Sequence, residues 1–233
     1  MPTVRDALAS IAIGLSTALV VVALAILPFL APPWVSFEQG RAQAAVWTGF
    51  TDEQLRAVTD SVLHDLVLGP PDFLASLPGE TTPVLKPNER AHMRDVRGVF
   101  MGFYSVAFAA ALVLAVAFLL TRGRPARARL WRRLARTGTV IAVVTVVGGG
   151  IGVLVFDQAF AMFHEIFFPG GNWQFDPRND RLVQLFPDRF WSETTVAVGI
   201  TVVALSLGLR WLGARRAASL ERSSPSGALA AAA

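Results

Sequence analysis

The sequence contains no cysteine. Disulfides, thiolate metal sites and a cysteine nucleophile that would carry an acyl group as a thioester are therefore excluded. This absence does not identify the redox compartment, because a chain without cysteine is compatible with either side of a membrane.

The chain also lacks the familiar catalytic and nucleotide-binding motifs. It has no G-x-S-x-G nucleophile elbow, no H-E-x-x-H zinc helix, no Walker A loop and no G-x-G-x-x-G loop. His164 and Glu165 begin a zinc-like pattern, but no second histidine follows at the required position. Two histidines without a third nitrogen ligand are a weak metal pattern, so we expect no metal and no other cofactor.

Charged residues are scarce, at 16% of the 233 residues, whereas a soluble domain has roughly 25%. Apolar residues make up 53%. They gather in four runs that each reach the ~20 residues needed to cross the hydrocarbon of a bilayer: 8–30, 99–120, 137–162 and 194–212. The first run exceeds the ~7–15 residues of a cleavable signal core, so we expect it to be retained.

This pattern predicts an all-α membrane protein with four transmembrane helices. We expect a single four-helix membrane domain over residues 1–222. The low-complexity tail at 223–233 is expected to be disordered.

Basic residues are distributed unevenly along the chain. The link between the second and third runs holds seven arginines and no acid: Arg122, Arg124, Arg127, Arg129, Arg132, Arg133 and Arg136. The segments 31–98 and 163–193 together hold nine basic and fourteen acidic residues. By the positive-inside rule, both termini and the arginine link are expected to be cytoplasmic, and the two segments to form an extracytoplasmic cap. Attraction to lipid headgroups explains the arginines, so we expect no nucleic-acid partner.

The most chemically varied segment lies between the third and fourth runs, at 163–191, and reads FHEIFFPGGNWQFDPRNDRLVQLFPDRFW. Its histidine, His164, stands at the mouth of a membrane run, where an ionisable residue costs free energy unless it is paired or used. A second histidine, His92, lies in PNERAHMRDV just before the second run. We expect these two side chains to meet on one side of the membrane and to act as general acid and base. The alternative is that both are interfacial residues bonded to backbone carbonyls.

Other polar side chains flank the two histidines. Asn88 is expected to cap the helix that leads to His92, and Asp95 to orient the imidazole from one turn further on. Asp157 lies in an apolar run two turns before His164, and should be paired with an external arginine. The predicted supporting or orienting residues are Asn88, Glu89, Arg90, Asp95, Asp157 and Glu165.

The third histidine, His64, belongs to a different kind of segment. Thr51 and Gln54 form the ends of a capping box that opens a helix with an apolar stripe. His64 lies off that stripe, so we expect it to be a solvated surface residue.

The motifs PNERAHMRDV and FHEIFFPGGNWQFDPRNDRLVQLFPDRFW resemble those of the bacterial lipoprotein intramolecular transacylases, small four-span membrane proteins. The resemblance implies a cytoplasmic-membrane enzyme with catalytic histidines at His92 and His164, where cap and membrane meet. It also implies a reaction that moves the sn-2 acyl chain of a diacylglyceryl lipoprotein to the amino group of its N-terminal cysteine. Such an enzyme needs no nucleophile of its own. The Gly170–Gly171–Asn172 turn and the arginine link depart from the family pattern.

An aromatic set near His164 would confine the substrate headgroup or, alternatively, form an interfacial belt: Phe163, Phe167, Phe168, Trp173 and Phe175.

The expected partners are a diacylated lipoprotein and membrane lipids; the oligomeric state is left open. Two other functional classes stay open at this point. One is a non-catalytic membrane adaptor whose acidic cap binds an exported partner, and the other is a metal-dependent membrane hydrolase.

Overall fold

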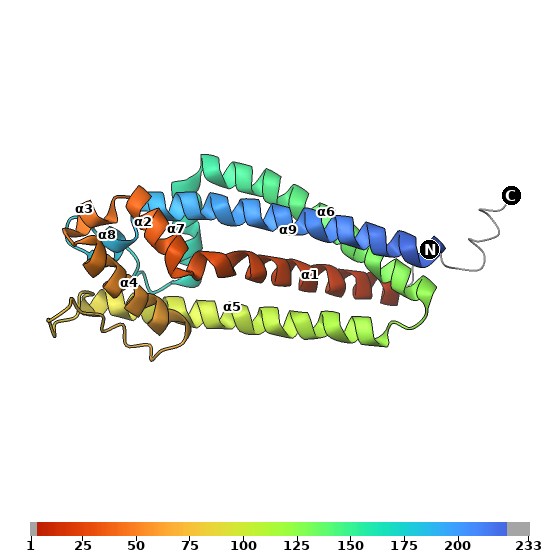
Figure 1. The fold of residues 1–233 in the computed structure, drawn as a ribbon, viewed down its shortest axis with the longest axis horizontal. Helices are drawn as coiled ribbons and strands as arrows, with labels where there is room; N and C mark the ends of the chain where they lie inside the picture. The colour runs from red at the N-terminus through yellow and green to blue at the C-terminus, as the bar shows by residue number, and fades with distance from the viewer. Residues whose placement is uncertain (1–3, 223–233) are drawn as a thin grey trace. The chain divides into compact units, whose positions relative to one another are not determined.

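The computed structural model describes residues 4–222. Within this range the regular structure is helical, apart from an isolated bridge between Ser76 and Pro83. In chain order the elements (Figure 1) are α1 Val4–Ile26, the 3-10 helix η1 Leu27–Leu30, α2 Pro32–Arg41, α3 Ala44–Thr48, α4 Asp52–Val67, α5 Pro87–Leu120, α6 Arg124–Leu154, α7 Phe156–Phe167, α8 Arg181–Leu185 and α9 Asp188–Arg222. The tail 223–233, predicted to be disordered, lies outside the described residues.

Four helical segments of the described chain are long and apolar enough to cross a membrane. They are Asp6–Leu30, Pro87–Leu120, Arg124–Leu154 and Asp188–Arg222. The predicted fold class, all-α with four transmembrane helices, is confirmed.

The third apolar run differs from its prediction at the C-terminal end. It was expected to continue to residue 162, but α6 ends at Leu154 and α7 begins at Phe156. Val155 between them has φ −124° and ψ 42°, outside the helical region. Several glycines at 148–152 precede the break, and each weakens a helix by about 1 kcal/mol relative to alanine. Asp157 and His164 therefore belong to a separate helix.

The chain divides into two compact units. Of the described residues, the first unit contains 4–25, 104–150 and 199–222, and the second contains 26–103 and 151–198. Helices α5, α6 and α9 contribute residues to both.

The first unit is held by apolar packing and by close helix approach. Ile13, Leu130 and Leu134 form a buried cluster. A Cβ placed on Gly138 of α6 would lie only 2.5 Å from the backbone oxygen of Ser206 in α9. Glycine at this position therefore permits the close contact between the two helices that is typical of membrane bundles.

The second unit has the larger buried core. Thr51 and Gln54 form the predicted capping box at the start of α4, and the apolar stripe of that helix is buried. The core joins α2, α4, the segment before α5, α8 and the start of α9 through Val35, Val58, Val62, Phe73, Leu85, Leu185, Phe186 and Phe190. The candidate site is built on this unit.

Candidate functional site

His92 on α5 and His164 on α7 lie next to each other in the second unit. Their rings are stacked, with centroids 6.0 Å apart and planes inclined by 25°. Both side chains are buried, at 5% and 9% exposure. The structure therefore brings the two predicted catalytic residues together, close enough for both imidazoles to serve one bound group.

His164 is fixed by its own helix. Its Nδ1 lies 2.8 Å from the backbone oxygen of Phe160, one turn earlier. A carbonyl oxygen can only accept, so Nδ1 carries the hydrogen and Nε2 keeps a lone pair when the ring is neutral. Burial lowers the pKa of His164 below its usual 6.5, although the bond to Phe160 opposes that shift. The ring is thus a neutral proton acceptor at neutral pH.

Aromatic rings enclose the histidine pair. His164 contacts Phe160, Phe163, Phe168 and Trp173, with centroid distances of 4.1–5.5 Å. His92 contacts Phe168 and Phe175, at 4.8 and 5.5 Å. Four of the five predicted aromatic residues therefore touch a histidine.

Two members of this aromatic environment differ from the prediction. Phe167 is 47% exposed and its ring packs on Phe163. Phe160 was not predicted as a site residue, yet it supplies both a ring and the carbonyl that holds His164. Its position four residues before His164 was the available signal, because residues at that spacing share a helical face.

A groove of about 440 Å³ lies beside the histidine pair. Its lining includes Phe168, which contacts both imidazoles, and it is formed by Arg94, Asp95, Gly98, Val99, Phe167, Phe168, Pro169, Gly170 and Asn172. The lining combines one cation, one anion and one amide with apolar and backbone surface. Such a mixture is typical of a site for an amphipathic ligand.

Within the described residues, the carboxylate of Asp95 is hydrogen-bonded to Asn172 and not to His92. It was expected to orient His92 directly, but its Oδ2 accepts a hydrogen bond of 2.6 Å from Nδ2 of Asn172. Sequence reasoning placed Asn172 only in a turn and missed this contact. The turn residues 169–172 lie far from Asp95 along the chain, so no local pattern indicated the pair.

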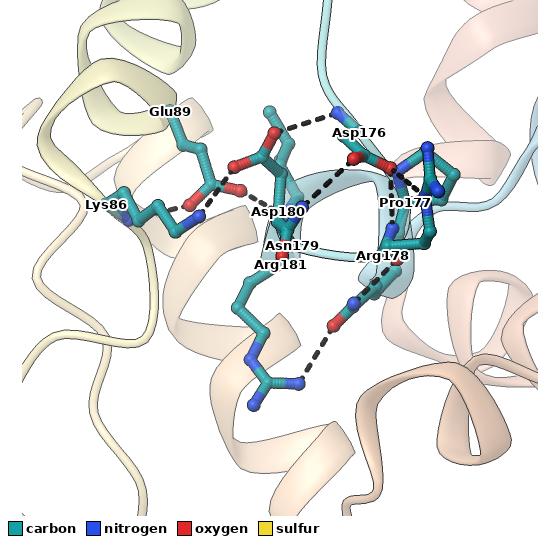
Figure 2. A network of polar contacts seen from close by, with 10 residues as sticks. Lys86, Glu89, Asp176, Pro177, Arg178, Asn179, Asp180 and Arg181 are labelled. Carbon is teal, nitrogen blue, oxygen red and sulfur yellow. Dashed lines mark hydrogen bonds and ion pairs between the residues drawn. The ribbon is translucent and has the colours of Figure 1, made fainter.

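Glu89 joins the segments that carry the site through hydrogen bonds. Its buried carboxylate accepts hydrogen bonds from the backbone nitrogens of Lys86, at 2.7 Å, and Leu182, at 2.6 Å. Figure 2 shows how the network continues, with Nζ of Lys86 bonded to Asp180 at 2.9 Å and Asp180 accepting from the backbone of Asp176. Glu89 therefore ties the start of α5, one turn before His92, to the first turn of α8, at the end of the loop that follows α7.

Among the described residues, Asn88, Asp157 and Glu165 form no hydrogen bond or ion pair with either histidine. Asn88 is not the N-cap, because α5 begins at Pro87, a residue type favoured in the first turn. Asp157 and Glu165 are exposed, and within residues 4–222 neither forms an ion pair with Arg90, Arg94 or Arg97. The expected pairing of Asp157 with one of these arginines is therefore absent there.

His64 has a side chain that is 60% exposed and lies 3.4 Å from Asp65. In the part of the chain that is described, no three histidine, aspartate or glutamate side chains are grouped so that they could hold a metal ion.

Comparisons with known proteins agree on one family. The family model described as lipoprotein intramolecular transacylase Lit matches residues 10–191. The chain is similar to in meso structures of the membrane integral lipoprotein intramolecular transacylase Lit from Bacillus cereus, with a TM-score of 0.76, 18% identity and 94% of this chain covered. The first covers 99% of its own chain; two variants, with histidine replaced by arginine or alanine, cover 95% and 96% of theirs. The likeness shows the same fold. None of the curated proteins compared with the chain matches it.

Proposed function

Because the chain belongs to the lipoprotein intramolecular transacylase family, Lit, we propose that it transfers an acyl chain within one lipoprotein molecule. The sn-2 acyl chain of the diacylglyceryl group passes to the amino group of the N-terminal cysteine that bears it. His92 and His164 supply general acid and base catalysis. The substrate is a diacylated lipoprotein in the bacterial cytoplasmic membrane.

One observation carries this proposal, the pair of stacked imidazoles beside the groove. The rings are 6.0 Å apart, and Nδ1 of His164 is bonded so that Nε2 is the nitrogen that can take a proton. The groove next to them has apolar surface for an acyl chain or glyceryl group and polar surface for an amine and an ester. Holding those two reacting groups together can supply about 7–11 kcal/mol of the barrier.

The reaction is balanced without a protein nucleophile, water or cofactor. The amine nitrogen attacks the carbonyl carbon of the sn-2 ester, and Nε2 of His164 takes a proton from that nitrogen. The carbon–oxygen bond of the ester then breaks, and His92 donates a proton to the departing glyceryl oxygen. The products are an amide on the cysteine and a hydroxyl at sn-2. Passage of one proton from His164 to His92 restores the pair.

The charge pattern supports one orientation for this chemistry. By the positive-inside rule, the arginine link supports a cytoplasmic location for itself and for both termini. The acid-rich segments 31–98 and 163–193, which contain both histidines, then face outward as an extracytoplasmic cap. A lipoprotein that has been exported and lipidated presents its amine and ester at that face.

Alanine variants test the proposal. His92→Ala and His164→Ala are each expected to reduce acyl transfer at least about 10²-fold, because general acid–base steps contribute ~10²–10⁴-fold. The assay is mass spectrometry of a diacylglyceryl peptide incubated with purified protein in lipid nanodiscs. His64→Ala, on the exposed face of α4, is the matched control and should keep wild-type activity. Unchanged acyl transfer in both site variants would exclude the two-histidine mechanism, and no transfer by the wild-type protein would favour a non-catalytic adaptor.

A further inference from the structure

The side chain of Asn172 connects Asp95 with His92. Its Nδ2 donates a hydrogen bond of 2.6 Å to Oδ2 of Asp95. The same amide is a hydrogen-bonding neighbour of the His92 ring. Among the described residues, neither Oδ1 of Asn172 nor Nδ1 of His92 has a partner at full hydrogen-bond geometry, and both atoms are buried.

Asp95 determines which way the amide faces. A carboxylate can only accept, so the NH₂ group of Asn172 must point toward Asp95. The other end of the amide is then Oδ1, which is also only an acceptor. The neighbouring His92 ring has a nitrogen that can supply a hydrogen to it. A buried donor and a buried acceptor that stay unpaired destabilise the fold, so they are expected to pair.

We propose that Asn172 is a positioning residue for the proposed acyl transfer. Held by Asp95, its Oδ1 accepts a hydrogen bond from Nδ1–H of His92. This bond fixes the tautomer of His92 and leaves Nε2 as the nitrogen that exchanges a proton with the substrate. The inference rests on the proposed function, but the tautomer of His92 can be measured by NMR without any activity assay.

This arrangement gives the two histidines matching orientations and different hydrogen-bond acceptors. His164 donates from Nδ1 to the neutral carbonyl of Phe160, whereas His92 donates to an amide backed by the carboxylate of Asp95. An anion two hydrogen bonds away favours an imidazolium at His92, whereas His164 has only the neutral carbonyl, so His92 is the better proton donor of the two. This assigns His92 as the general acid and His164 as the general base.

The tautomer of His92 can be measured directly. In ¹⁵N-histidine-labelled protein in nanodiscs, the ring-nitrogen chemical shifts report which nitrogen carries hydrogen, and His64→Gln and His164→Gln variants assign the three rings. We expect Nδ1–H for the neutral form of wild-type His92. Asn172→Ala is expected to shift it toward Nε2–H, while Gln174→Ala, an exposed amide of the same loop, leaves it unchanged. Nε2–H in the wild type, or no change in Asn172→Ala, would overturn the inference.

Kinetic measurements distinguish a positioning role of Asn172 from a role in holding the loop alone. Asn172→Ala is expected to lower kcat about tenfold with little change in KM, less than the ~10²–10⁴-fold of removing a general acid. Asn172→Asp keeps an acceptor for His92 but replaces the donor to Asp95 with a second carboxylate, and this pair carries a second negative charge at the alkaline pH where both are ionised. The charged groups acting on His92 are Asp95 on its own helix and His164 on α7. The alkaline limb of the pH–kcat profile should therefore move to higher pH in Asn172→Asp.

The failures of the two ideas are distinguishable. Equal losses in Asn172→Ala and Asn172→Asp, with unchanged pH profiles and lowered melting temperatures, mean that Asn172 only holds the loop. Retained activity in His92→Ala and His164→Ala contradicts the proposed function itself. In that case the tautomer measurement still decides whether Asn172 orients His92.

Discussion

At the residue scale, the burial of His164 determines how it titrates. The ring lies against Phe160, Phe168 and Trp173, and burial disfavours the charged imidazolium. The pKa of His164 is lowered for this reason, with the Phe160 carbonyl opposing the shift. His164 therefore stays neutral, and able to accept a proton, at a lower pH than a free imidazole.

We expect the NMR titration midpoint of His164 to lie below 6.5, the usual value for the side chain. Trp173→Ala exposes the ring to water and should raise that midpoint toward 6.5. Trp191→Ala is the control, because Trp191 contacts Phe186 and Phe190 but neither histidine. A wild-type midpoint at or above 6.5, or no response to Trp173→Ala, would show that burial does not control the ring.

Glu38 is a buried ionisable residue outside the site. It is 1% exposed, and one of its carboxyl oxygens has no partner among the described residues. Burial and then the neighbouring Glu193 raise the pKa of Glu38 from 4.5 to about 7, while Arg41 and Arg189 act in the opposite direction.

This shift predicts a pH-dependent stability. The folded pKa of Glu38 exceeds the unfolded value of 4.5, so its contribution to the free energy of unfolding is full below pH 4.5 and is lost as pH rises through about 7. Glu38→Gln, which is neutral at every pH, should match the wild-type melting temperature at pH 5 and exceed it at pH 8. Thermal unfolding in detergent measures both. If the melting temperatures of the wild type and of Glu38→Gln changed with pH in the same way, this assignment would be contradicted.

At the scale of the helices, the sequence predicted some boundaries and missed others for physical reasons. The α4 capping box depends only on neighbouring residues, Thr51 and Gln54, so a local pattern was sufficient. Hydropathy cannot report backbone dihedrals, and the interruption at Val155 was therefore missed. The start of α5 was also displaced, because Pro87 opens the helix one residue before the predicted cap, Asn88.

Helix packing in the first unit yields a prediction of its own. Gly138→Ala places a Cβ 2.5 Å from the backbone oxygen of Ser206, and backbone cannot move aside as a flexible side chain can. Overpacking of this kind costs about 1–3 kcal/mol. Gly148→Ala on the same helix is the control, since its Cβ meets nothing within 4 Å. A lower melting temperature is expected for Gly138→Ala but not for Gly148→Ala; equal values would exclude close packing at Gly138.

At the scale of the whole molecule, composition predicted more than any single motif. Four apolar runs and scarce charge were enough to predict a multi-pass membrane protein, because the bilayer sets the length of a span. The two histidines could be singled out because ionisable residues at membrane mouths are costly. Asn172 could not, since its contact with Asp95 depends on how the loop after α7 folds back onto α5. Contacts between residues so far apart in the chain produce no local sequence pattern.

The central claim is that His92 and His164 move an acyl chain within one lipoprotein molecule. It can be tested by reconstituting the protein with two diacylglyceryl peptides that differ in peptide sequence and in isotopic labelling of the sn-2 chain. Mass spectrometry should find each labelled chain on the cysteine nitrogen of its original peptide, with no product in His92→Ala or His164→Ala. Labelled chains exchanged between peptides, or transfer that persists in both variants, would contradict the account.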